Sequence, residues 1–62
     1  MKTYSFKLLL PRGTTMEAAY WAGLKHIKNE LNLKTYADYR PVGSELHPTM
    51  SGMGIWSYSY KA

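Results

Sequence analysis

The chain has 62 residues, a formal net charge of +4 and no cysteine. Its length allows one compact domain, residues 1–62, and the lack of cysteine excludes disulfide bridges and thiolate zinc sites. No stretch has the roughly 20 apolar residues of a membrane span or the apolar centre of a secretion signal, so we expect a cytoplasmic protein with no membrane partner.

Residues 3–10 alternate between apolar and polar side chains. Every second side chain of a strand points the same way, so this pattern predicts a half-buried strand. The apolar positions are Tyr4, Phe6, Leu8 and Leu10. Pro11 is expected to end the strand because proline cannot donate a hydrogen bond to the sheet.

A helix is predicted at about residues 15–31. Thr14 and Glu17 have the spacing of a capping box, in which Thr14 would cap the first turn. Asn32 is suited to the left-handed conformation that often follows a helix. The residues expected to form the buried stripe are Met16, Tyr20, Leu24, Ile27 and Leu31. Gly23 lies beside this stripe and indicates a close approach of the helix to a strand.

The rest of the chain predicts a loop, a short strand and a final strand. Residues 42–46 form the candidate short strand, 47–53 a loop rich in glycine, proline and serine, and 54–61 the last strand. The expected fold class is α+β, with one helix packed on a two- or three-stranded sheet. The first and last strands could pair in parallel, or antiparallel if residues 42–46 are a strand. Exposed sheet edges would allow a homo-oligomer.

The last strand places three large aromatic side chains on one face, from Trp56, Tyr58 and Tyr60. If they point inward, they complete the core under the helix. If they point outward, they form an open platform that can stack on bases. Burial favours the inward orientation, because the other face of this strand would be a weak core strand built from Met53, Ile55 and serines.

No residue pattern identifies an enzyme. His26 and Glu30 are four residues apart on the predicted helix and can form a surface pair. His47 has no partner that the sequence identifies, and these three residues do not have the spacing of a zinc site. We therefore predict no catalytic residue, no metal ligand and no cofactor.

Trp21 is the strongest indication of function. It lies about 100° from the centre of the predicted stripe, among Glu17, Lys25 and Lys28 and beside a strip of small side chains. Tryptophan, tyrosine and arginine dominate the centres of protein interfaces, so the pattern favours docking on a larger protein or nucleoprotein complex. Alternatively, Trp21 folds over the edge of the core. The expected partner-binding residues are Ala18, Trp21, Ala22, Lys25, Lys28, Tyr36, Tyr39 and Arg40.

The sequence therefore predicts a small, basic, non-catalytic binding module of accessory or inhibitor type, a character shared by many compact phage and mobile-element proteins. The alternative function is direct binding of single-stranded DNA or RNA by stacking and phosphate contacts. Its expected residues are Lys7, Arg12, Trp56, Tyr58, Tyr60 and Lys61. A self-assembling structural subunit is a third alternative.

Overall fold

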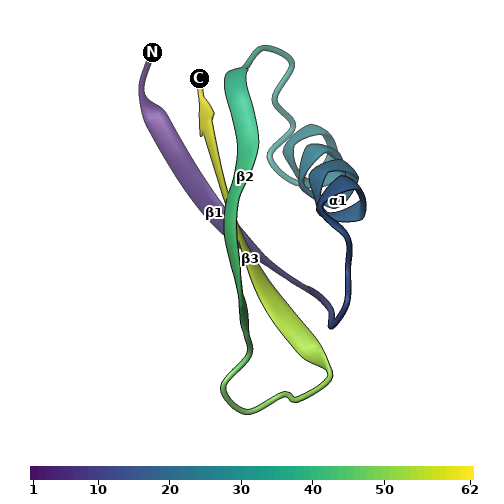
Figure 1. Cartoon of the computed structure of the whole chain (residues 1–62). Coiled ribbons are helices and arrows are strands. Elements are labelled where there is room, and N and C mark those ends of the chain that lie inside the picture. The colour runs from purple at the N-terminus through teal and green to yellow at the C-terminus, as the bar shows by residue number, and fades with distance from the viewer.

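The computed structural model describes residues 1–62 as one helix and three strands. In chain order these are β1 (Thr3–Pro11), α1 (Met16–Asn29), β2 (Ala37–Leu46) and β3 (Met53–Lys61). β3 is the central strand, and β1 and β2 pair with it antiparallel, one on each side. α1 lies on one face of this sheet and leaves the other face uncovered (Figure 1). The α+β prediction is confirmed, and the parallel pairing is wrong. α1 is neither long nor apolar enough to cross a membrane.

β1 has the alternation that the sequence predicts. Phe6, Leu8 and Leu10 are half-buried towards the helix, whereas Ser5 and Lys7 are exposed. The strand includes Pro11, which pairs with Met53 at the end of the ladder. Because the strand is at an edge of the sheet, a proline at its last residue removes no interior hydrogen bond.

β2 begins five residues earlier than the predicted short strand at 42–46. Its pairing with β3 shifts register twice, between Ala37 and Arg40 and again between Pro41 and Gly43. Asp38, inside the first shift, has a positive φ of 51°. These two irregularities allow an edge strand to contain a proline and a left-handed residue, both of which suggest a loop in the sequence.

The helix begins one residue later than the predicted capping box. Thr15, not Thr14, caps it, with its Oγ1 accepting a hydrogen bond from the Ala18 amide at 3.2 Å. The Thr14 hydroxyl instead donates to the Pro11 carbonyl oxygen at 2.5 Å and closes the turn after β1. At the other end α1 stops at Asn29, two residues before the predicted end, and Asn32 has the left-handed φ expected of it, 52°.

The helix is rotated relative to the predicted stripe. Its buried residues are Ala19, Gly23 and Ile27, whereas Met16 is 61% exposed and Tyr20 is 38% exposed. At 100° per residue the buried side is turned by about 60° from the centre of the predicted stripe. Leu31, also in that stripe, is 38% exposed. The stripe prediction is therefore wrong for Met16, Tyr20 and Leu31. The physical reason is that tyrosine rings from the sheet fill the space beneath Ala19 and Gly23, where a larger helix side chain would not fit, so that Ile27 is the one large helix side chain buried on this side.

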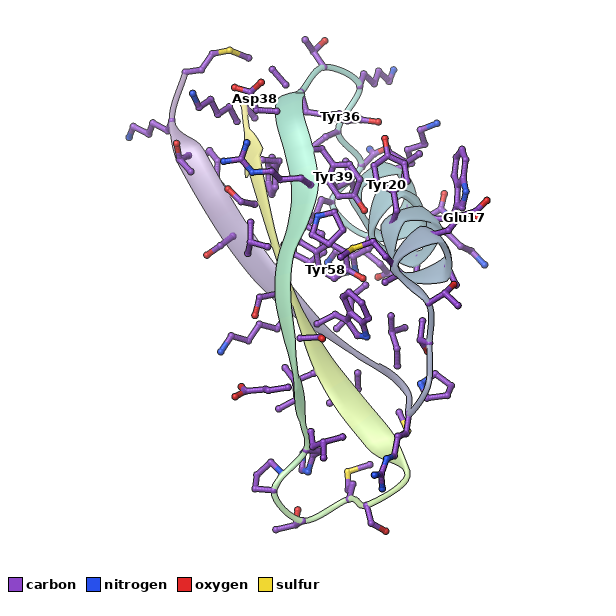
Figure 2. The ribbon with its side chains drawn as sticks, in the orientation of Figure 1. Glu17, Tyr20, Tyr36, Asp38, Tyr39 and Tyr58 are labelled. Carbon is purple, nitrogen blue, oxygen red and sulfur yellow. The ribbon has the colours of Figure 1, made fainter.

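The aromatic row of β3 provides that bulk. Trp56, Tyr58 and Tyr60 are 9%, 0% and 8% exposed, so the inward orientation is confirmed. The Tyr58 ring stacks on Phe6 with centroids 4.8 Å apart, and its hydroxyl donates to the Ala19 carbonyl oxygen at 2.7 Å. Figure 2 shows Tyr58 between the sheet and α1. Burial raises the pKa of the Tyr58 hydroxyl, which keeps it a protonated donor.

The core is thin. Only 7 of the 62 residues are buried, and the accessible surface is 4436 Å². Globular proteins of this mass, 7.1 kDa, expose roughly 4,100 Å² by the usual scaling of surface with mass. The chain thus leaves more surface in water than a fully covered domain of its size, and each buried side chain carries a large share of its stability.

The β2–β3 connection is organised by a histidine. The Nδ1 atom of His47 accepts hydrogen bonds from the amides of Thr49 at 3.1 Å and Met50 at 3.0 Å. Both amides point at the same ring nitrogen, so the imidazole holds the loop in the way that an asparagine side chain does in an Asx turn.

His47→Ala is expected to lower the free energy of unfolding by about 1 kcal/mol, because it removes the acceptor of two backbone amides. His47→Asn keeps an acceptor atom at a similar reach and should lose less than half as much. Urea denaturation of both variants measures the difference. Equal stability of the alanine variant and the wild type would show that the ring does not hold the loop.

Candidate functional site

Trp21 lies on the outer side of α1. It is two residues from Gly23, which faces the sheet, and this spacing turns its side chain by about 160° from the buried direction. The indole is 59% exposed and takes no part in the core cluster of Ala19, Trp56 and Tyr58. The helix rotation therefore places Trp21 more directly in solvent than the predicted stripe does.

Trp21 is the end of a continuous row of aromatic rings. Its ring meets Tyr20 edge-on with centroids 5.5 Å apart, Tyr20 lies 5.0 Å from Tyr39, and Tyr39 lies 6.4 Å from Tyr36. We call these four residues the aromatic strip. Figure 2 shows Tyr20 and Tyr39 between α1 and β2, with Tyr36 near the connection that leads into β2. The strip joins the outer side of the helix to the start of β2.

The inner part of the strip is held rigidly. The Tyr39 hydroxyl donates to the Tyr20 carbonyl oxygen, and the ring stacks on Tyr58 with centroids 6.1 Å apart and planes 7° from parallel. Desolvation raises the pKa of the Tyr39 hydroxyl, and the neighbouring hydroxyls of Tyr58, Tyr20 and Tyr36 raise it further. Tyr39 thus stays protonated and anchors Tyr20, against which Trp21 lies.

Two lysines lie on one side of the exposed indole. Lys25 and Lys28 are exposed on the same side of α1 and, with Trp21, Leu24 and Asn29, line a shallow hollow in the helix surface. The helix has one acidic residue, Glu17, in its first turn. The surface around Trp21 is therefore apolar at its centre and positively charged on one side.

The structure brings together only part of the predicted partner-binding set. Ala18, Trp21, Lys25 and Lys28 are exposed on the helix. Tyr36 and Tyr39 are half-buried and reach Trp21 through Tyr20.

Two of the predicted residues lie elsewhere. Ala22 is half-buried in a hollow between α1 and β1. Arg40 is exposed and pairs with Ser59, whose neighbours in β3, Tyr58 and Tyr60, face the helix. Arg40 therefore belongs to the uncovered face of the sheet, because successive residues of a strand point to opposite faces.

Tyr20 was missed by the sequence reasoning, which placed it in the core. The signal that could have found it is the spacing of Ala19, Gly23 and Ile27, which are separated by four residues each. Two small residues one turn apart, with an isoleucine on the same side one turn later, mark a helix side that can approach a sheet closely, and this places Tyr20 at the edge of the contact.

The predicted nucleic-acid platform does not form. Trp56, Tyr58 and Tyr60 are buried under the helix, whereas Lys7 alternates with them across the ladder and points to the uncovered face. Lys61 pairs with Asp38 at 3.2 Å. Arg12 lies beyond the end of β1, in the turn before the helix. Lys7 and Lys61 thus lie on the opposite face of the sheet from the rings, because successive residues of a strand alternate between faces. Arg12 is the exception, since it lines a hollow together with Trp56 at the end of the sheet.

The remaining polar side chains form no concentrated site. No group of three or more histidine, cysteine, aspartate or glutamate side chains is placed to hold a metal ion. His26 packs against Phe6 with ring centroids 4.6 Å apart.

Comparison of the chain with protein-family models, with curated proteins and with solved structures found no match.

Proposed function

We propose that this protein is a small, non-catalytic binding module that docks on a larger protein, alone or within a nucleoprotein complex, through the aromatic strip. The observation that carries the proposal is the 59% exposure of Trp21, a side chain that contributes nothing to the buried core. Tryptophan and tyrosine are among the residues that most often form the energetic centres of protein interfaces.

The bracing supports the proposal because it lowers the entropic penalty of binding. Tyr20 touches Trp21 on one side and Tyr39 on the other, and Tyr39 is fixed by its hydrogen bond to the Tyr20 carbonyl. A side chain that is already ordered loses less freedom when a partner covers it. The side chains of the aromatic strip are thus pre-organised for binding in the free protein.

The charges near Trp21 support an acidic partner. Lys25 and Lys28 lie beside the indole, and the chain as a whole carries +4. We expect an acidic protein surface with an apolar pocket that receives Trp21. Complementary charge of this kind mainly accelerates encounter and sets orientation, while the buried ring supplies most of the affinity.

Trp21→Ala is expected to weaken partner capture by at least about 30-fold, which corresponds to roughly 2 kcal/mol at an interface centre. The same variant should melt within a few degrees of the wild type, because the indole is outside the core. The measurement is capture from a nuclease-treated lysate by the immobilised full chain, followed by titration of the retained protein. Leu46→Ala, at a residue that is 63% exposed at the end of β2, is the matched control and should bind like the wild type.

Two results would contradict the proposal. A partner retained equally by the wild type and Trp21→Ala would show that the strip is not the docking site. A retained partner that disappears after nuclease, with affinity falling log-linearly and steeply with salt, would indicate phosphate contacts and favour nucleic-acid binding instead.

A further inference from the structure

The two edges of the sheet differ in their protection. All residues of β1 from Thr3 to Pro11 pair one-to-one with β3, without a bulge. β2, at the other edge, has two register shifts, a proline at position 41 and a left-handed residue at Asp38. Bulges and prolines are the usual means by which an edge strand avoids pairing with another chain. β2 has them within its length, whereas β1 has no bulge and its one proline, Pro11, is its last residue.

The free hydrogen-bonding groups of β1 can be assigned from the ladder. Lys2 and Ala62 exchange both backbone hydrogen bonds, each at 3.1 Å. Bonded and non-bonded pairs alternate in an antiparallel ladder, so even-numbered residues of β1 point their N–H and C=O groups towards β3. The odd-numbered residues point theirs away from the sheet. The unpaired donors of this edge are therefore the amides of Thr3, Ser5, Lys7 and Leu9.

The helix-facing side of β1 is also incompletely covered. α1 packs mainly against β2, which is the edge strand opposite to β1. Tyr4 is 44% exposed, Phe6 and Leu8 are only half-buried, and a hollow lined by Leu8, Leu10 and Ala22 separates the strand from the helix. A chain added at this edge would pair with free backbone groups and cover apolar side chains at the same time.

We propose that β1 pairs with β1 of a second copy of this chain, antiparallel and about a twofold axis at Phe6. Thr3 of each copy then lies opposite Leu9 of the other, and Ser5 opposite Lys7. Every unpaired amide of the edge meets a carbonyl oxygen, and the two three-stranded sheets become one continuous sheet.

The side chains select both the occupant and the register. β1 is self-complementary in this arrangement, because Tyr4 faces Leu8 of the other copy and the two Phe6 rings are neighbours, which are favourable cross-strand pairs. The register centred on Lys7 would place the two Lys7 ammonium groups directly opposite each other, and like charges so placed are destabilising. Lys7 therefore disfavours that register. The register centred on Phe6 is also the one in which Thr3, Ser5, Lys7 and Leu9 all pair among themselves, whereas a register centred on Ser5 would leave Leu9 opposite Met1, outside the strand.

Sedimentation equilibrium of the full chain, from low to high micromolar concentration, tests the pairing. The wild type should form a dimer, and its association should strengthen with salt because each copy carries +4. S5K places a second lysine opposite Lys7 at two symmetric positions and should weaken the dimer about ten-fold. S5K combined with K7E converts this repulsion into attraction and should restore the dimer. S51K, in an exposed loop, adds the same charge away from the edge and is the matched control.

The proposal is overturned if the wild type is monomeric throughout this range, or if S5K dimerises as tightly as S51K. Circular dichroism establishes that each variant is folded. Because the chain has no cysteine, single thiols give a second test that does not depend on S5K. An equimolar mixture of S5C and K7C should form the mixed disulfide under mild oxidation, with little K7C homodimer. A K7C homodimer as the main product would place Lys7 opposite itself and contradict the register.

Discussion

Replacing Gly23 with alanine is expected to lower the free energy of unfolding by at least about 2 kcal/mol. A Cβ at this position would meet the hydroxyl of Tyr39 and the ring of Tyr58 well inside contact distance. Neither ring can retreat easily, because the two stack on each other and each donates a hydrogen bond to a carbonyl of α1. Overpacking of about 3 kcal/mol outweighs the roughly 1 kcal/mol that alanine gains in a helix.

Urea denaturation measures this loss, and Gly43→Ala is the matched control. A Cβ at Gly43 would meet nothing within 4 Å, so that variant should stay within about 0.5 kcal/mol of the wild type. A Gly23→Ala variant more stable than the wild type would mean that helix propensity decides the outcome and that the helix does not lie against these two tyrosines.

Tyr58→Ala is expected to cost about 3–5 kcal/mol, the range for removing a fully buried aromatic side chain. Tyr58 is 0% exposed, lies under Gly23 and stacks on Phe6 and Tyr39. In a core of so few buried residues, this loss should leave a large unfolded fraction at room temperature. Tyr58→Phe keeps the ring and loses only the hydrogen bond to Ala19, so it should cost about 1 kcal/mol.

Thermal and urea unfolding of Tyr58→Ala and Tyr58→Phe separate the contribution of the ring to stability from that of the hydroxyl. Tyr4→Ala is the control, because Tyr4 also stacks in the aromatic row, on Tyr60, but is 44% exposed. The dependence of the free energy of unfolding on pH, measured at alkaline pH, gives a further check. The pKa of Tyr58 is raised in the folded state, so the unfolded chain loses this proton first and stability falls as the pH rises through 10. Tyr58→Phe should reduce that fall. Equal losses for Tyr58→Ala and Tyr4→Ala would contradict the placement of Tyr58 in the core.

Much of the fold follows from local features of the sequence. The alternation around Phe6 and Leu8 predicts β1, the threonine-rich turn before Glu17 predicts the start of α1 to within one residue, and Asn32 has the expected left-handed conformation. The inward direction of the β3 aromatics could also be predicted, because the opposite face of that strand has too little apolar area to form a core.

The rotation of the helix could not be predicted from hydrophobicity alone. Ala19 and Gly23 have little apolar surface to bury, so side-chain hydrophobicity favours Met16 and Tyr20 over them as core residues. Their advantage is that they let Tyr39 and Tyr58 reach the helix backbone, which depends on side chains from other strands. The early start of β2 could not be predicted for a similar reason. Asp38 and Pro41 favour a turn locally, but the register shifts in the pairing with β3 allow both residues to lie within a strand.

The candidate site was predictable only in part, even within the helix, because Trp21, Lys25 and Lys28 are exposed as expected, whereas Tyr20 and Ala22 are not where the sequence placed them. Trp21 and its lysine neighbours share a helix, so their common exposure follows from helix periodicity. Tyr39 and Arg40 were expected together, but they are adjacent in a strand and point to opposite faces. That separation depends on β2 existing at these residues, which the sequence did not indicate.

The environment of Trp21 can be measured directly by fluorescence quenching. In a Trp56→Phe variant, Trp21 is the single tryptophan, and Trp21→Phe supplies the matching signal of the buried ring. We predict emission like that of an indole in water, quenched more strongly by iodide than by caesium because the lysines beside the ring attract anions. Emission shifted to the blue and insensitive to both ions would show that the helix buries its tryptophan, and the docking surface would then not exist.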